Sequence, residues 1–246
     1  MNLSGHNALI TGAGQGIGRA CAEVLALKGA DVVLLDKNSK ALSATAKKIK
    51  AMGRRVFSRS QDLTDVQALK KTVQDATHEG RIDILVNNAG YDRPGTTAKI
   101  SSDDFLDVIG IHLVVPFVLI QQLLPAMCTA GWGRVINVSS IYALTGAKAE
   151  VAYSTAKAGV IGLTKSVAKE AGPEGVTVNA ILPGLTRTPT IEKFMADKYK
   201  QPIVDQTPLG RMGEAEEIAH VVAFLASDEA SFITAAAIPI SGGWGI

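Results

Sequence analysis

The chain has little cysteine and no cluster of metal-ligating side chains. Cys21 and Cys128 are the two cysteines among 246 residues. Both lie within helical patterns, and neither has the spacing of a metal or redox motif, which favours a reduced, cytoplasmic setting. His6, His78 and His220 are isolated in the sequence. No group of His, Cys and carboxylate residues has ligand spacing, so no metal is expected.

The net charge is also small. The formal net charge is +2, and no run of Lys and Arg forms a basic stripe. Nucleic acid is therefore not an expected partner. The first residues, Met1–Gly5, have neither a basic start nor an apolar stretch before the first strand-like run, so no secretory signal is expected.

One long segment has no charge at all. Val108–Gly133 contains no Asp, Glu, Lys or Arg, and a run of that length raises a membrane-spanning interpretation. His112, Pro116, the pair Gln121–Gln122 and Pro125 argue against it, because they are polar or disturb a helix. We expect a helix that is kinked near Pro116 and is buried in the protein or at a subunit contact. No membrane partner is expected.

Short β-rich runs alternate with helical patterns along the first two-thirds of the chain, which is typical of βαβ units and a parallel sheet. Runs such as Val32–Leu35 are apolar on both faces, as a parallel strand between helices requires. The expected strands are Asn7–Thr11, Asp31–Asp36, Arg55–Ser60, Ile82–Asn87, Arg134–Ser139, Thr177–Leu182 and Ala237–Ile240. The expected helices are Gly16–Gly29, Ser39–Met52, Asp65–Glu79, Ser101–Ala130, Val151–Gly172 and Glu214–Ser227. The sequence thus predicts one α/β domain over residues 1–246, a doubly wound parallel sheet with helices on both faces.

One long irregular segment interrupts this alternation. Pro183–Gly210 is rich in Pro and Thr, and a loop of that length in a compact domain is often functional. We expect it to be a lid over the substrate.

A glycine-rich loop follows the first expected strand and opens the first helix. Glycines allow a tight turn and a close approach to a pyrophosphate, whose charge then rests on the helix N-terminus. The strand before, the helix after and an acid at the end of the next strand make this a dinucleotide signature rather than a structural turn. The residues expected to contact the cofactor here are Gly12, Gln15, Gly16, Ile17 and Gly18.

The acid is Asp36, and it favours NAD. A carboxylate at this place can accept both adenosine-ribose hydroxyls and would repel a 2′-phosphate. Two like charges ~4 Å apart at an effective dielectric of ~20 repel by about 4 kcal/mol. Gln15 supplies no positive charge to offset the repulsion, whereas Lys37 leaves dual specificity open.

Ser140, Tyr153 and Lys157 form the pattern Ser-x12-Tyr-x3-Lys. The last two lie one helical turn apart and share a face. An ammonium beside the phenol lowers the phenol pKa from about 10, which would make Tyr153 a general base near neutral pH.

Together with the glycine loop, Asn87–Gly90 and Pro183–Gly184, this pattern resembles the short-chain dehydrogenase/reductase family. The resemblance extends from Thr11 to the glycine pair near the end. It implies a Rossmann fold with strand order 3-2-1-4-5-6-7, and a homotetramer that packs its long helices together. It also implies that Ser140 positions the substrate oxygen, Tyr153 transfers the proton, and Lys157 binds the nicotinamide ribose. The further cofactor contacts that it implies are Asp62, Leu63, Asn88, Ala89, Gly90, Pro183, Gly184, Thr186 and Thr188.

Two positions depart from the family pattern. His112 stands where the family usually has an Asn that completes a catalytic tetrad. Either the essential contact is a backbone carbonyl, which any residue provides, or His112 itself relays protons and adds a titration near pH 6.5. The second departure is Ala235, in Ile233–Ala236, where the family often has a glycine. Alanine has less φ freedom there, which puts the subunit-contact geometry in doubt more than catalysis.

The substrate end is less defined. Besides Ser140 and Tyr153, we expect Tyr142 and Glu150 to wall the pocket, together with apolar lid residues such as Phe194. The main hypothesis is an NAD-dependent oxidoreductase that interconverts a secondary alcohol and its ketone. One alternative is an NADPH-dependent 3-oxoacyl-thioester reductase, and another is a non-catalytic dinucleotide sensor or scaffold on the same fold.

Overall fold

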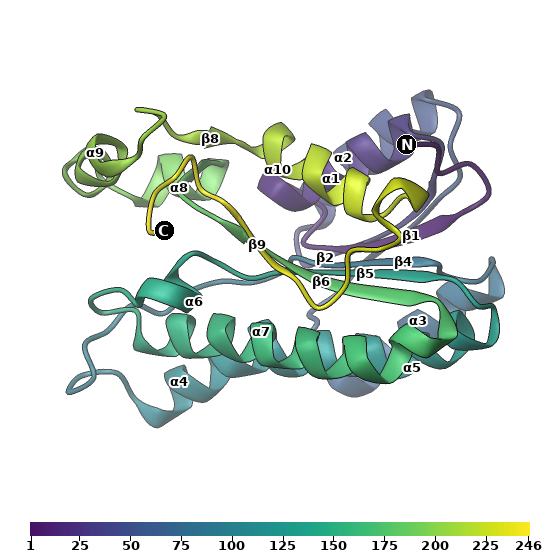
Figure 1. The fold of residues 1–246 in the computed structure, drawn as a ribbon, viewed down its shortest axis with the longest axis horizontal. Coiled ribbons are helices and arrows are strands. Elements are labelled where there is room, and N and C mark those ends of the chain that lie inside the picture. The colour runs from purple at the N-terminus through teal and green to yellow at the C-terminus, as the bar shows by residue number, and fades with distance from the viewer.

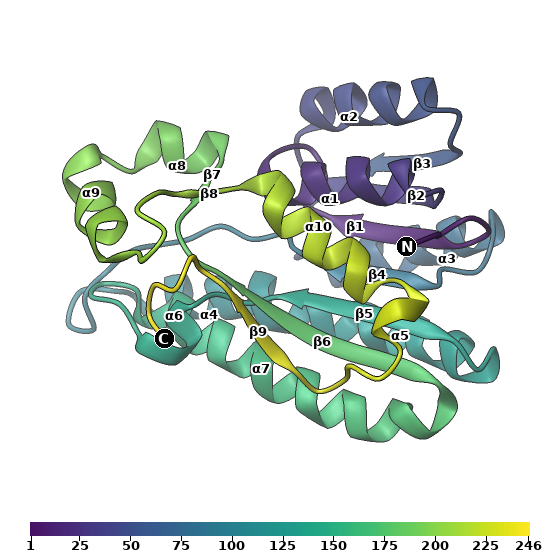
Figure 2. The ribbon, with the colours of Figure 1, turned by 45° about the horizontal axis from the view of Figure 1, so that its top comes forward.

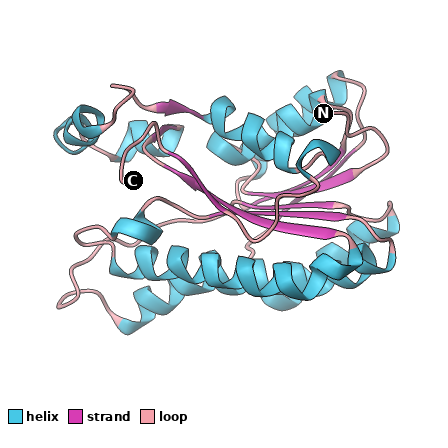
Figure 3. Ribbon diagram, viewed as in Figure 1, coloured by secondary structure: helices cyan, strands magenta, loops and turns pink.

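The computed structural model describes residues 1–246 as a three-layer α/β molecule, with one parallel sheet between two layers of helices (Figures 1 and 3). The seven strands of the sheet follow the order β3-β2-β1-β4-β5-β6-β9. Their bounds are β1 (Asn7–Thr11), β2 (Asp31–Asp36), β3 (Val56–Ser60), β4 (Ile84–Asn87), β5 (Gly133–Val138), β6 (Val176–Pro183) and β9 (Ala237–Ile240). All pairs are parallel, so the doubly wound prediction and the predicted strand order are confirmed.

Helices cover both faces of the sheet. The main ones are α1 (Gly16–Leu27), α2 (Ser39–Ala51), α3 (Val66–His78), α4 (Ser102–Ile109), α5 (Val115–Thr129), α7 (Val151–Ala171) and α10 (Ala215–Leu225). Figure 2 shows α1, α2 and α10 on one face, and Figure 1 shows α3, α4, α5 and α7 on the other. Short pieces complete the chain: α6 (Tyr142–Thr145), and the 3₁₀ turns η2 (Gly172–Glu174) and η3 (Asp228–Ala230).

Two apolar cores result from the alternation of side chains along each strand. In β1, Ala8 and Ile10 pack toward α1 and α10, whereas Leu9 packs toward α3 and α5. All three are fully buried. Each helix thus buries its apolar stripe against one face, and the carboxyl ends of all the strands meet at one edge.

Side-chain caps fix where several helices begin. Asn38 Oδ1 accepts a hydrogen bond from the amide of Ala41 at 3.1 Å, and Ser101 Oγ accepts one from the amide of Asp104 at 3.0 Å. Such caps satisfy amides that have no partner within the helix. Asp103 and Asp104 in the first turn of α4 add favourable charge at the positive end of the helix dipole.

Most of the charge-free segment, from Val108 to Thr129, lies in a continuous helix, Ser102–Thr129. This helix is long and apolar enough to cross a membrane, yet half of its most apolar window is buried inside the protein. A π-helical turn, η1 (Gly110–Val114), separates α4 from α5 directly before Pro116. Proline has no N–H to donate to the carbonyl four residues earlier, which here is that of His112. The disturbance expected near Pro116 is thus a π turn.

The structure corrects the interpretation of Pro183–Gly210 as irregular. This segment contains β7 (Thr186–Arg187) and two helices, α8 (Pro189–Phe194) and α9 (Asp197–Gln206). β7 pairs in parallel with β8 (Gly213–Glu214) in a small second sheet. The segment stands apart from the three layers at the carboxyl edge of the sheet (Figure 1), where a lid would lie.

Candidate active site

The predicted site residues come together at the carboxyl edge of the sheet. The glycine loop follows β1, Asp36 ends β2, Asp62 and Leu63 follow β3, and Asn88 follows β4. Ser140 follows β5 and Gly184 follows β6. In an open α/β sheet this edge is where ligands bind, at the point where strand order reverses between β1 and β4.

The backbone of the glycine loop requires its glycines. Gly12 and Gly16 have φ angles of 66° and 54°, in the left-handed region. A Cβ on Gly18 would lie 2.2 Å from the Gly12 carbonyl oxygen, so helix α1 approaches the start of the glycine loop too closely for any side chain there. The residues present therefore fit a pyrophosphate cradle, with the N-terminus of α1 turned toward it.

Thr11 ties this loop to the segment after β4, a role that the sequence did not suggest. Its Oγ1 accepts hydrogen bonds from the amides of Asn88 and Ala89 at 2.9 and 3.0 Å. The Asn88 amide group in turn donates to the Thr11 carbonyl oxygen at 2.9 Å. Both walls of the expected cofactor groove are thereby held at a fixed separation.

Asp36 faces the glycine loop. Its Oδ2 accepts a hydrogen bond from the amide of Gly14 at 2.9 Å, and its Oδ1 accepts one from the amide of Asn38 at 2.8 Å. Lys37 does not neutralise it by an ion pair. Its ammonium lies 4.8 Å from the centroid of the Tyr91 ring instead.

The remaining expected cofactor residues are held locally. Asp62 accepts two hydrogen bonds from Thr64, which lower the pKa of its carboxyl group. Thr188 caps α8 by accepting from the Ile191 amide at 3.3 Å, and a Cβ on Gly16 would lie 3.2 Å from the Thr188 methyl carbon. The lid therefore begins directly against the glycine loop. Pro183 ends β6, Gly184 follows it and Thr186 is buried in β7.

Ser140, Tyr153 and Lys157 are brought together between β5 and α7. Ser140 and Lys157 are buried. The Lys157 ammonium donates to the Val138 carbonyl oxygen at 2.6 Å and lies 5.5 Å from the centroid of the Tyr153 ring. The helix backbone is fixed as well, because Ser139 Oγ donates to the Lys157 carbonyl oxygen at 2.8 Å.

The electrostatics differ from the expectation that Lys157 lowers the Tyr153 pKa. Burial raises the pKa of Tyr153 to about 12, and a hydrogen bond with Ser140 offsets this only in part. Burial also lowers the pKa of Lys157 to about 7. Because desolvation disfavours the charged form of each group, the protein by itself holds a protonated phenol, and its lysine is a weak source of positive charge.

A buried amide pair links the strands beneath the site, and the sequence did not suggest it either. Asn87 donates to Asn137 Oδ1 at 2.8 Å, and Asn137 donates to Thr164 Oγ1 at 2.9 Å. These bonds join β4, β5 and α7, so the helix that carries Tyr153 and Lys157 is pinned to the sheet.

His112 lies beside Tyr153. Its ring is edge-on to that of Tyr153, with centroids 5.1 Å apart. Burial and the nearby Lys157 lower the pKa of His112 well below 6.5. The titration near pH 6.5 that a relay role implied is therefore displaced to lower pH.

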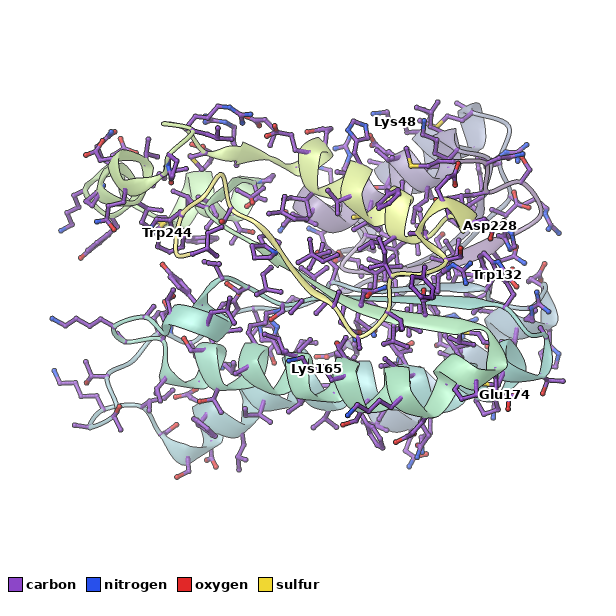
Figure 4. All side chains as sticks on the ribbon, viewed as in Figure 1. Lys48, Trp132, Lys165, Glu174, Asp228 and Trp244 are labelled. Atoms are coloured by element: carbon purple, nitrogen blue, oxygen red, sulfur yellow. The ribbon has the colours of Figure 1, made fainter.

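The expected substrate side has aromatic rings and two carboxyl groups. Tyr142 is edge-on to Tyr153 and to Trp244, with centroid separations of 6.5 and 5.5 Å. Burial, with a hydrogen bond to Asp92, raises the pKa of Glu150 to about 8. Trp244, labelled in Figure 4 beside the C-terminal loop, was not expected here, because no motif marks it and only the return of the chain end places it.

Two apolar lid residues, Phe194 and Tyr199, are 73% and 59% exposed. They are not packed against the rest of the protein in this arrangement of the lid, and a role in walling the substrate site stays a prediction.

The similarity of this chain to known proteins agrees with this geometry. A family model described as enoyl-(acyl carrier protein) reductase matches residues 12–245. Over 244 residues the chain is 38% identical to the 3-oxoacyl-(acyl-carrier-protein) reductase FabG of Thermotoga maritima, covering 99% of each chain. The chain belongs to the short-chain dehydrogenase/reductase family. It is accordingly an oxidoreductase, and its cofactor is a nicotinamide dinucleotide.

Solved structures of family members are very similar. The crystal structure of levodione reductase matches with a TM-score of 0.94 at 36% identity, covering 98% of each chain. A 3-oxoacyl-(acyl-carrier protein) reductase with bound NAD from Brucella melitensis matches with a TM-score of 0.92 at 31% identity. That match covers 99% of this chain and 92% of the other.

Proposed function

We propose that this short-chain dehydrogenase/reductase uses NAD(H) and interconverts a small polar secondary alcohol and its ketone. The observation that carries the proposal is the place of Asp36. Its carboxylate is hydrogen-bonded to the amide of Gly14 in the phosphate loop, so a negative charge stands beside the expected position of the adenosine ribose. A 2′-phosphate there would be repelled, while ribose hydroxyls can donate to the free lone pairs.

No cation of the chain offsets this charge. Lys37 lies over the Tyr91 ring, among carboxylates whose pKa it helps to lower, those of Asp62 and Asp107. Gln15 donates to Thr190 Oγ1 at 3.2 Å and is uncharged. Gln15 therefore offers a 2′-phosphate no positive charge, and the Lys37 ammonium is engaged with the Tyr91 ring rather than with Asp36.

The residues of the chain divide the proton chemistry among them. A bound nicotinamide ring supplies or accepts the hydride. Ser140 donates a hydrogen bond to the substrate oxygen, and Tyr153 gives that oxygen a proton in reduction or takes it in oxidation. Because the Tyr153 pKa is about 12, the phenol is protonated at neutral pH and holds the proton that reduction requires, and the phenolate that remains is stabilised when Lys157 is charged.

The pocket supports a polar substrate. Glu150 and Asp92 interact through their side chains, and Glu150 Oε2 is buried with no hydrogen-bond partner. A carboxyl group with a pKa of about 8 is protonated at neutral pH and can donate to a hydroxyl or carbonyl of the substrate. These acids and the Tyr142 hydroxyl give the pocket more polar groups than an alkyl chain would require.

A second candidate is the reduction of 3-oxoacyl thioesters. It is favoured by the name of the Thermotoga maritima relative, which is similar over its whole length. The Brucella melitensis enzyme of that name was solved with bound NAD, so NAD use alone does not exclude this candidate. Against it stands the exposed carboxylate of Asp92, since an acyl carrier and its phosphate are themselves acidic.

Cofactor preference and substrate preference are tested by two separate experiments, and the first measures cofactor binding. NADH and NADPH are titrated by fluorescence against the wild type, Asp36→Ala, and Asp75→Ala, which removes an exposed acid on α3 as a control. We expect NADH to bind more tightly by roughly a thousandfold, the size of the repulsion estimated for Asp36. Only Asp36→Ala should relax the preference. Tighter NADPH binding to the wild type would contradict the proposal.

Turnover is then measured with each cofactor on secondary alcohols, their ketones and a short 3-oxoacyl thioester. We expect NAD-dependent turnover of polyhydroxylated or diketone-type substrates at the highest kcat/KM. A higher kcat/KM with the thioester would establish the second candidate instead.

We further propose a cytoplasmic homotetramer. Leu106, Val114 and Phe117 are large apolar side chains on the outer face of the long helix and are 62%, 43% and 47% exposed. A face of this kind is typically covered by another subunit. Light scattering should give four times the mass of the chain, and a stable monomer would contradict the proposal.

A further inference from the structure

His112 sits in the π turn between α4 and α5 and is buried to 4% exposure. Its Nε2 lies 2.8 Å from the Tyr91 carbonyl oxygen. Because a carbonyl can only accept, Nε2 carries the proton and donates, and Nδ1 is left with a lone pair. Nδ1 is buried and has no hydrogen-bond partner, so the ring is anchored at one nitrogen only.

One edge of the imidazole packs on the backbone of Gly90. A Cβ at Gly90 would lie 1.9 Å from Cε1 of His112, and 2.5 and 2.7 Å from its two nitrogens. All three nearest atoms belong to this one ring. The imidazole therefore fills the space that a side chain at position 90 would need.

On another side the ring meets Tyr153. The two rings are perpendicular, at 89°, with centroids 5.1 Å apart. Edge-to-face pairs of this kind have a preferred geometry and restrict the rotation of both partners. Leu113, the next residue, packs against α7 as well, since a Cβ on Gly159 would lie 2.8 Å from it. The π turn is thus wedged between the segment after β4 and the helix of Tyr153.

We propose that His112 is a positioning residue whose imidazole, held between the Gly90–Tyr91 backbone and the Tyr153 ring, sets the distance between the cofactor wall and the phenol. The side chain acts by shape and by one hydrogen bond to the Tyr91 carbonyl, as a neutral ring. It does not carry a proton to or from Tyr153. A glycine at position 90 and a histidine at position 112 are then a matched pair.

The matched pair is tested by a double-mutant cycle. Gly90→Ala forces a methyl group into the imidazole, and we expect the Kd of NADH to rise about tenfold, as overpacking in a tight site predicts. His112→Ala removes the obstacle, so Gly90→Ala should have little effect in that background. Gly162→Ala on α7, where a Cβ meets nothing within 4 Å, is the control for the chemical change itself. Additive effects of the two substitutions would overturn the proposal.

Shape is separated from proton relay by the choice of side chain. We expect His112→Ala to lower kcat by roughly tenfold to a hundredfold, since a misplacement of about 1 Å has effects of that size. His112→Phe keeps a ring against Gly90 and Tyr153 and should recover part of this loss, with an unchanged acidic limb of the pH profile. A Phe variant as slow as the Ala variant would overturn the proposal in favour of a relay.

A merely structural role is also distinguished. In that case His112→Ala would lower Tm but leave kcat and the Kd of NADH at their wild-type values, which would overturn the proposal. The inference rests on the proposed function for the role of Tyr153 and for the use of NADH as the titrated cofactor; if NADPH binds the wild type more tightly, the same cycle is measured with NADPH. In the double-mutant cycle, the Kd of NADH and the Tm are measured without any substrate. The cycle therefore tests the His112–Gly90 pair even if the alcohol panel gives no turnover.

Discussion

The floor and the mouth of the active site are built in different ways. The floor consists of Ser140, Tyr153 and Lys157, on the end of β5 and on α7. The floor is hydrogen-bonded to the sheet, because the Lys157 ammonium donates to the Val138 carbonyl oxygen. Because α7 is anchored to the buried strand β5, the positions of the three side chains relative to one another are fixed.

The mouth draws on segments that are far apart in the chain. Tyr142 comes from α6, Glu150 from the start of α7, Trp244 from the C-terminal loop, and the lid from α8 and α9. The lid's Phe194 is 73% exposed. From this difference we expect the floor to set the class of reaction and the mouth to set the substrate, so that the mouth is free to differ among relatives with different activities.

The largest expected effect concerns the floor. Tyr153→Phe removes the acidic hydroxyl while keeping the ring edge-on to His112. We expect kcat to fall roughly a thousandfold, the usual contribution of a general acid or base, with NADH binding and Tm near those of the wild type. Initial rates, fluorescence titration and thermal unfolding check this. A residual kcat within tenfold would show that another group transfers the proton.

A change in the mouth should act on substrate binding instead. Trp244→Ala removes the edge-to-face partner of Tyr142, and such a pair contributes about 1 kcal/mol. We expect KM to rise severalfold while kcat stays within a factor of about two, since this pair is not part of the reacting constellation. If kcat falls and KM does not change, the division between floor and mouth is wrong.

Stability offers a sharper test, because a strained alanine lies at the mouth and another lies away from it. Ala149 precedes Glu150, and Ala235 precedes β9, with φ angles of 65° and 59°. Glycine adopts these angles without the Cβ clash, so each Ala→Gly change should raise the unfolding free energy by about 1 kcal/mol. Denaturant unfolding measures this gain. Only Ala149→Gly should also alter KM, and a destabilised Ala235→Gly protein would contradict the strain argument.

The last prediction is a pH dependence of stability at Glu150. The Glu150 pKa is raised from 4.5 in the unfolded chain to about 8 in the folded one, so its stabilising contribution is present below pH 4.5 and is lost as pH rises through 8. Glu150→Gln cannot lose a proton. Its stability relative to the wild type should therefore increase between pH 5 and pH 8, by less than the full linkage value because the group is half-buried.

Unfolding curves at several pH values measure the change, and Asp92→Asn is the control. That substitution removes one of the groups that raise the Glu150 pKa, so the difference should become smaller in its presence. A difference that is independent of pH would mean that Glu150 is ionised in the folded protein.

The strands and long helices were well predicted because their patterns are local. β1, β2 and β9 have the bounds expected from the sequence, since continuous apolar runs between turn residues mark buried parallel strands. The two helices of the lid were missed because α8 and α9 are short. Their stability comes from the Thr188 cap and from ion pairs of Glu192 with Arg187 and Lys200, which alternation of apolar residues does not reveal.

The sequence by itself indicated the reaction class and the candidate residues of the floor, because a glycine loop, an acid at the end of β2 and a Tyr-x3-Lys turn are each set by neighbouring residues, and the resemblance to the family added the strand order. Only the tertiary structure decided that Trp244 faces Tyr142, that Asp92 meets Glu150, and that burial holds the Tyr153 pKa at about 12. These facts depend on desolvation and on contacts between distant segments. Neither exists until the chain has folded.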